Sequence, residues 1–195
     1  MDDIMLKSFL TKHRDDLMKY DYEKIYADCP DCAYLTNFLY KRANRNPLIH
    51  MKKIPQDMFR GVSLPELTIP RNITEGILYG FSCDKLMIEA PIRGYSDLVI
   101  SNCRLGKVLL GDGFTRIKRS FIKYDNVINM LKLPDSIQKI DNEGIACSEN
   151  NFIIVTNKRD ERNRIIIPKN EIDYYKKHLR YLRAKQVEEP AEEEL

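Results

Sequence analysis

Histidine and cysteine, the residues that often supply metal ligands and nucleophiles, are scarce in this chain, with 3 His and 5 Cys among 195 residues. An odd number of Cys at scattered positions argues against a disulfide framework and favours a reduced, cytoplasmic protein. None of the His lies within the clear repeats described below, so no Ser-His-Asp or Cys-His catalytic set can be nominated from spacing. We therefore expect a protein without enzymatic activity and without a cofactor.

Long apolar runs are also missing. No segment approaches the roughly 20 consecutive apolar residues that span a bilayer. The apolar stretch after the acidic start, residues 1–3, is interrupted by Lys7, Lys12 and Arg14, which is not the pattern of a secretory signal. We expect a soluble protein with no membrane partner, and its 43% hydrophobic residues are enough to build a core.

The sequence does contain a short phrase that recurs with variation. Each copy has alternating apolar residues, then Pro or Gly, then usually a small polar residue and another apolar one. The copies cover residues 64–73, 105–114, 127–137 and 164–168. The spacings from Ile69 to Ile88 and from Leu110 to Leu133 lie close to the period of about 20–29 residues found in leucine-rich repeats. Such recurrence predicts a solenoid, whose broad exposed face favours binding over catalysis.

One stretch of this phrase points to a family. Residues 64–83 read Leu-x-x-Leu-x-Ile-Pro-x-x-Ile and, after seven further residues, Phe-x-Cys, which resembles the BspA-type leucine-rich repeats. Segments 108–121 and 133–140 resemble them as well. The helical start that leads into residues 46–59 is similar to small repeat proteins encoded by large bacteriophages. The resemblance spans about residues 48–176, and it implies an interaction scaffold with no shared catalytic residues, acting in the cytoplasm of a bacterial host.

The chain divides into four segments. Residues 1–47 have apolar residues near helical spacing and end at Asn46-Pro47, where the residue before Pro avoids the helical region, so we expect a helical cap. Residues 48–150 form the irregular solenoid. Residues 151–186 contain two β-rich runs that predict a hairpin, then a final helix, and residues 187–195 are expected to be a disordered acidic tail. The fold class is therefore α+β: a short leucine-rich-repeat-like β-solenoid with an N-terminal helical cap and a C-terminal hairpin plus helix.

The sharpest local motif is Cys29-Pro30-Asp31-Cys32, which lies between two helical runs. A C-x-x-C pair can be half of a zinc site, a redox pair, or two small residues in a turn between helices. Zinc needs two further ligands, and no second C-x-x-C or closely spaced His pair occurs. Thioredoxin-type chemistry expects the pair to follow a strand, whereas helical sequence flanks it on both sides here. We favour the turn, and zinc binding or redox chemistry at Cys29 and Cys32 stays open.

Basic residues cluster in the C-terminal part of the chain. The formal net charge of +3 includes five Glu within residues 188–195, so the rest of the chain sums to +8. Arg and Lys interleave there with aromatic residues, a pattern that can hold phosphates and stack bases or can supply hot spots for a protein partner. The candidate binding residues are Arg116, Lys118, Arg119, Lys123, Tyr124, Arg159 and Arg162.

Two functions fit these features. Acidic residues such as Asp125, Asp141 and Glu143 lie among the basic ones and would interrupt a continuous positive stripe. We therefore favour a non-catalytic protein–protein interaction module, a phage-encoded effector that binds a host or phage protein. Nucleic-acid binding through the basic C-terminal third is the alternative.

Overall fold

The computed structural model describes residues 1–123, 125–141, 143–145 and 153–156, and its first part is a group of short helices. The helices are α1 (Asp3–Lys12), α2 (Arg14–Met18), α3 (Tyr22–Ala27), α4 (Cys32–Asn37), the π-helix η1 (Phe38–Arg42) and the 3-10 helix η2 (Pro47–His50). The strands are β1 (Lys53–Ile54), β2 (Ser63–Ile69), β3 (Glu75–Tyr79), β4 (Ser82–Ile88), β5 (Asp97–Ser101), β6 (Arg104–Leu110), β7 (Arg116–Ile117), β8 (Val127–Leu133), β9 (Lys139–Ile140) and β10 (Ile153–Thr156).

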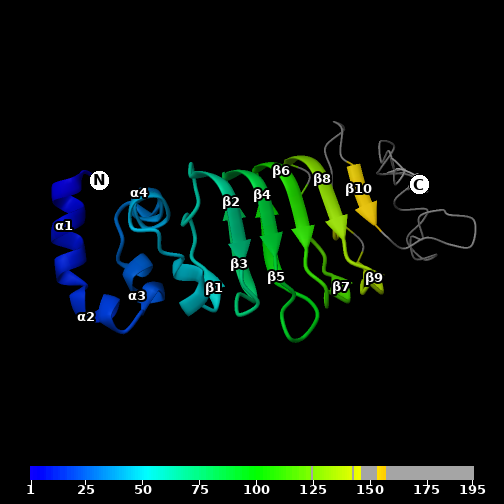
Figure 1. Cartoon of the computed structure of the whole chain (residues 1–195), viewed down its shortest axis with the longest axis horizontal. Coiled ribbons are helices and arrows are strands. Elements are labelled where there is room, and N and C mark those ends of the chain that lie inside the picture. The colour runs from blue at the N-terminus through cyan, green and yellow to red at the C-terminus, as the bar shows by residue number, and fades with distance from the viewer. Residues whose placement is uncertain (124, 142, 146–152, 157–195) are drawn as a thin grey trace, which may run out of the picture.

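The strands form a β-solenoid in which all the strand pairs of the described residues are parallel (Figure 1). The largest sheet has the order β10-β8-β6-β4-β2, and the intervening chain forms two smaller sheets, β1-β3-β5 and β7-β9. Neighbouring strands of the large sheet are not consecutive in sequence, because the chain leaves the sheet and returns to it once in every turn. This architecture confirms the predicted solenoid.

The strand register reproduces the repeat spacing of the sequence. Ile69 pairs with Ile88, and Ile88 pairs with Leu110, at the ends of β2, β4 and β6. A second column of paired residues, each 3% exposed or less, consists of Leu67, Leu86, Val108 and Leu131. Because equivalent apolar residues of successive turns stack on one another, each turn buries the apolar edge of the turn before it.

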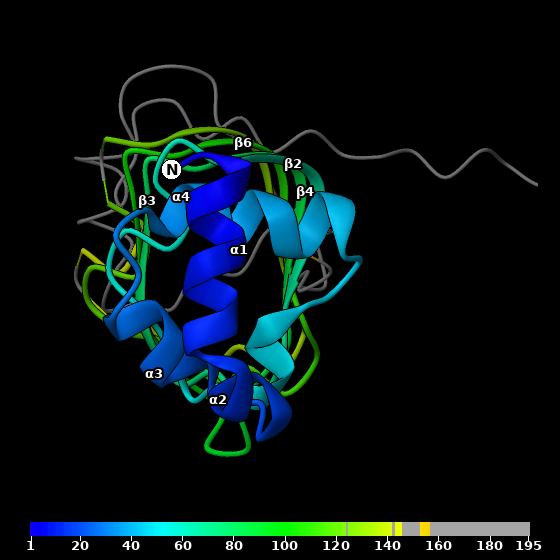
Figure 2. The same cartoon turned by 90° about the vertical axis from the view of Figure 1, so that its left-hand side faces the viewer.

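The helices cover the N-terminal end of the solenoid (Figure 2). Helices α1, α3 and α4 each begin after an Asp whose carboxylate accepts a hydrogen bond from a backbone N–H of the first turn. These residues are Asp2, Asp21 and Asp31. Leu35 of α4 is fully buried, and the hydroxyl of Thr36 donates to the carbonyl of Met58 at 2.7 Å. The helical cap is confirmed, and Pro47 is the first residue of η2, so the chain changes direction where the Asn-Pro step predicted.

A buried asparagine ties two successive turns together. The Oδ1 atom of Asn126 accepts a hydrogen bond from the N–H of Cys103 at 2.9 Å. Its Nδ2 donates to the carbonyls of Ile100 and Lys123 at 2.8 and 2.6 Å. Asn126 therefore supplies hydrogen bonds to backbone N–H and C=O groups at a corner between strands. Buried backbone groups need such partners.

Strand β10 extends the large sheet, because Ile153 and the residues after it pair in parallel with Met130 and the rest of β8. The first of the two predicted C-terminal β-rich runs is thus a strand. The second run at 164–168, the predicted final helix and the acidic tail at 187–195 lie outside the described residues. No helix of the described part of the chain is long and apolar enough to cross a membrane.

Candidate functional site

The large sheet presents a regular outward surface made by alternate residues of β2, β4, β6 and β8. One row across the strands consists of Glu66, Lys85, Lys107 and Met130, and the next consists of Thr68, Met87, Leu109 and Lys132. We call these residues the outer face. Parallel strands lie about 4.8 Å apart, so the in-register residues of each row are neighbours on one surface.

Apolar side chains form the centre of the outer face. Met87, Leu109 and Met130 are half-buried against their neighbours, and charged or polar residues surround them. The backbones of β4 and β6 approach closely next to this face, since a Cβ atom on Gly106 would lie 2.5 Å from the carbonyl oxygen of Asp84. An apolar centre with a polar rim is the usual anatomy of a protein interface, and methionine adapts its shape to a partner.

The rim of the outer face is positively charged. The ammonium of Lys85 pairs with the carboxylate of Glu66 at 3.2 Å. Lys107 and Lys132 are exposed, and within the described ranges neither side chain forms an ion pair with a carboxylate. Three Lys and one Glu leave the outer face with a net charge of +2, so it is suited to a partner surface that carries carboxylates.

Those predicted basic residues that the structure describes lie elsewhere, on β7 and the loop after it. Arg116 donates from Nε and Nη2 to the two carboxylate oxygens of Asp141 at 2.8 and 2.7 Å. This bidentate pair lowers the pKa of Asp141 below its ordinary value, mainly through the hydrogen bonds from Arg116. The guanidinium of Arg116 is therefore already occupied by a partner from the next turn of the solenoid.

The neighbouring basic residues are neutralised in the same way. Lys118 pairs with Asp97, and Arg119 pairs with Glu143 at 2.7 Å. Lys123 is exposed. The other predicted binding residues, Tyr124, Arg159 and Arg162, lie outside the described residues. The structure thus brings part of the predicted cluster together, but as a ladder of ion pairs between turns and not as a free basic surface.

An aromatic residue that the sequence analysis missed lies at the centre of this ladder. The Arg93 guanidinium and the Lys118 ammonium lie 4.5 and 5.2 Å from the centroid of the Tyr95 ring. Arg93 and Lys118 both pair with Asp97, and their hydrogen bonds lower the pKa of that carboxyl. Nothing in the spacing of Tyr95 signals its contact with Lys118, which depends on the stacking of two turns.

Replacing Asp141 with Asn should lower the thermal midpoint at pH 7 by a few degrees and leave it unchanged near pH 2. The folded-state pKa of Asp141 is depressed, so its pairing with Arg116 stabilises the fold above the unfolded value of about 3.9. That contribution disappears as the pH falls through the folded-state pKa. Calorimetry across this pH range measures it, with the exposed Asp135→Asn variant as the control. An equal loss at both pH values would contradict the assignment.

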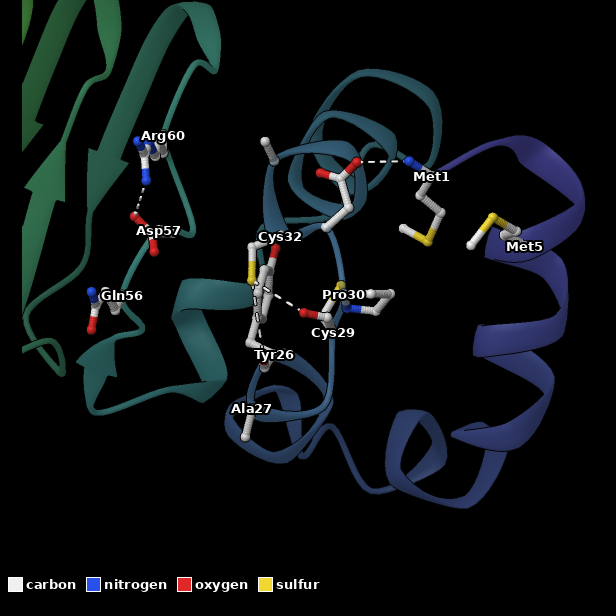
Figure 3. A pocket seen from close by; sticks show the side chains of 12 residues that line it. Met1, Met5, Tyr26, Ala27, Cys29, Pro30, Cys32, Gln56, Asp57 and Arg60 are labelled. Carbon is white, nitrogen blue, oxygen red and sulfur yellow. Dashed lines mark hydrogen bonds and ion pairs between the residues drawn. The ribbon is translucent and has the colours of Figure 1, made fainter.

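The C-x-x-C motif lies at a second location, in the connection between α3 and α4, with Cys32 as the first residue of α4. This confirms the predicted turn between helices. Cys29 and Cys32 are half-buried and line a cavity of about 740 Å³ (Figure 3). Among the described residues, no group of three or more His, Cys, Asp or Glu side chains could hold a metal ion.

Comparison with protein-family models, curated proteins and solved structures found no match for this chain. The resemblance to BspA-type leucine-rich repeats and to phage-encoded proteins therefore stays a prediction. The function proposed below therefore rests on the geometry of the described residues.

Proposed function

We propose that this protein is a non-catalytic interaction module that binds another protein through the outer face of its large sheet. The observation that carries the proposal is the composition of that face: an apolar centre at Met87, Leu109 and Met130 with a lysine rim. A rigid strand scaffold holds this surface in place, so binding requires little ordering of the chain. As part of this proposal, the partner is a host or phage protein in the bacterial cytoplasm, which is what a resemblance to phage-encoded repeat proteins would imply.

The charges of the outer face favour a partner with carboxylates around an apolar patch. Lys107 and Lys132 reach from the rim without a carboxylate partner among the described residues, so an acidic surface would complement them. The half-buried side chains between them would supply the contact area that excludes water.

Nucleic-acid binding through the basic C-terminal third has weaker support. Arg116, Lys118 and Arg119 each pair with a carboxylate of another turn. A phosphate would have to displace those carboxylates, and each displacement would leave an uncompensated negative charge close to the ligand.

Replacing Lys107 and Leu109 with Glu together should weaken partner binding at least about tenfold, because both the apolar contact and the charge complementarity are lost. The measurement is affinity capture from a bacterial lysate, with each retained protein quantified and then titrated in purified form. The matched control is Ile77→Glu, at a 44% exposed position of β3 in a different sheet.

Both variants should stay folded, with thermal midpoints within a few degrees of that of the wild type, because none of the substituted side chains is fully buried. A protein retained by wild type and by the Ile77→Glu variant, but lost from the outer-face variant, would support the proposal. Equal retention by all three proteins would contradict it. Salt-sensitive binding of a mixed-sequence oligonucleotide, unchanged by the outer-face substitutions, would favour the nucleic-acid alternative.

A further inference from the structure

We propose that Cys29 and Cys32 form a redox-active dithiol that exchanges with small-molecule disulfides in the cavity between the helical cap and the first turn of the solenoid. This proposal does not depend on the outer face or on a protein partner. It rests on the position of the two thiols, on the cavity that they share, and on the charged groups around them.

The cavity is built from parts of the chain that are far apart in sequence. Met1 and, from α1, Met5 lie on one side of it, and the C-x-x-C connection lies between them and the loop before β2 (Figure 3). Asp57 and Arg60, from the loop before β2, form the opposite wall. Its volume of about 740 Å³ lies within the range of about 300–1,000 Å³ that is typical of small-molecule sites. A ligand of that size would therefore meet both sulfurs.

The two thiols differ from the other described cysteines in their exposure. Cys83 and Cys103 are buried in the solenoid, and burial raises the pKa of each to about 11. Such thiols are inert at neutral pH because the thiolate is the nucleophile. Cys29 and Cys32 are half-buried and open to the cavity. Thiol chemistry among the described cysteines is therefore concentrated at the C-x-x-C pair.

The two sulfurs also interact with each other. The Cys32 thiol lies 3.8 Å from the carbonyl oxygens of Cys29 and Tyr26, so it is folded back over the connection between the helices. Each thiol is the largest influence on the other: the Cys29 thiol lowers the pKa of Cys32, and the Cys32 thiol raises the pKa of Cys29. In the proposed exchange Cys32 therefore attacks first, and Cys29, the more basic thiol, attacks in the second step.

The charged groups that face the pair nearly cancel. The carboxylate of Asp31 accepts a hydrogen bond from the ammonium of Met1 at 2.8 Å. Across the cavity Asp57 lies 3.6 Å from the guanidinium of Arg60. Asp31 and Asp57 alone would disfavour a thiolate at Cys32, because like charges repel. Each of these carboxylates is itself paired with a cation, Asp31 with the Met1 ammonium and Asp57 with the Arg60 guanidinium.

The proposed exchange has two steps. The Cys32 thiolate attacks one sulfur of a small disulfide, forms a mixed disulfide and releases the first thiolate, which takes up a proton from water. Cys29 then loses its proton and attacks the Cys32 sulfur, which releases the second small thiol and closes the Cys29–Cys32 disulfide. Two protein thiols are oxidised and one small disulfide is reduced to two thiols, so atoms and electrons balance.

The test uses the reduced full chain and oxidised glutathione as the probe. Intact mass should show the loss of two hydrogens, and peptide mapping should place the new disulfide between Cys29 and Cys32. The Cys29→Ser variant should accumulate a mixed disulfide at Cys32. The Cys32→Ser variant should form its mixed disulfide at least about tenfold more slowly, because the remaining thiol is the more basic one.

Cys103→Ser is the control, and it should form the disulfide at the wild-type rate. In the unmodified chain, a limiting amount of iodoacetamide should label Cys32 before Cys29, which checks the order of reactivity without any substitution. The proposal is overturned if the wild type forms no Cys29–Cys32 disulfide, or if the two single variants react equally fast. Recovery of the chain with zinc bound at these thiols and resistant to the probe would also overturn it.

Discussion

Gly76→Ala should destabilise the fold by roughly 2–5 kcal/mol, the largest loss that we expect from a single added methyl group. Gly76 has φ +129°, and a Cβ atom there would lie 2.6 and 2.7 Å from the backbone nitrogen and oxygen of Ile54. Ile54 is the register partner of Gly76 in the pairing of β1 with β3. Both strands would have to separate, so the first turn of the solenoid would lose its junction with the helical cap.

Urea denaturation followed by circular dichroism measures this loss, and Gly61→Ala is the matched control. Gly61 also has a positive φ, +72°, but no heavy atom lies within 4 Å of its Cβ position. Its substitution should therefore cost only about 1–2 kcal/mol, the penalty of the left-handed conformation. Equal denaturation midpoints for the two variants would show that the close approach of Gly76 to β1 contributes nothing.

Phe81→Ala should destabilise the fold by roughly 3–5 kcal/mol, because it leaves a cavity where two turns meet. Phe81 has no exposed surface, and its ring packs against Phe59 with the centroids 5.1 Å apart in an edge-on arrangement. Because Phe59 precedes β2 and Phe81 precedes β4, this contact joins the start of the solenoid to its next turn. Removal of the ring would loosen the packing of the start of the solenoid and of the turn after it.

The same denaturation experiment tests this expectation, with Ile77→Ala as the control on the neighbouring strand. Ile77 is 44% exposed, so its truncation should change the free energy of unfolding by no more than about 0.5 kcal/mol. A Phe81→Ala variant as stable as that control would mean that the first two turns hold together without the aromatic contact.

The repeat spacing was predictable because one physical requirement applies at every turn. Each strand must place apolar side chains on the inside at alternate positions, and the next strand must place its own at the same level. The columns that contain Ile69, Ile88 and Leu110 therefore appear in the sequence as a period before they appear in space as paired residues. The helix starts depend on an equally local contact, because the N-cap Asp accepts a hydrogen bond from a backbone N–H three residues later, but the sequence analysis did not use this signal.

The binding residues were less predictable, because the sequence shows which residues are basic but not which carboxylates pair with them. The sequence analysis chose Arg116, Lys118 and Arg119 as candidates for a binding surface. Each of them pairs with a carboxylate that lies at least 21 residues away along the chain. Stacking of turns brings these residues together, so a cluster that is basic in sequence is nearly neutral on the surface.

At the outer face and at the C-x-x-C cavity, too, the sequence predicted a pattern, and only the tertiary structure decided which residues meet. Alternation predicted that one side of each strand would point outward, but only the register of the parallel strands places Met87 beside Leu109 and Lys107 beside Met130. The cysteine pair was visible as a motif, with its chemistry left open. The cavity around it exists because the N-terminal helix and the loop before β2 close on the same connection.

The sequence by itself thus determined the solenoid, the parallel stacking period and the helical cap, because these follow from local propensity and from a repeated pattern of burial. Tertiary structure alone decided which basic residues are neutralised, which side chains share the outer face and which groups surround Cys29 and Cys32. Those outcomes depend on contacts between turns about 20 residues apart, whose geometry is set by packing and not by neighbours in the chain.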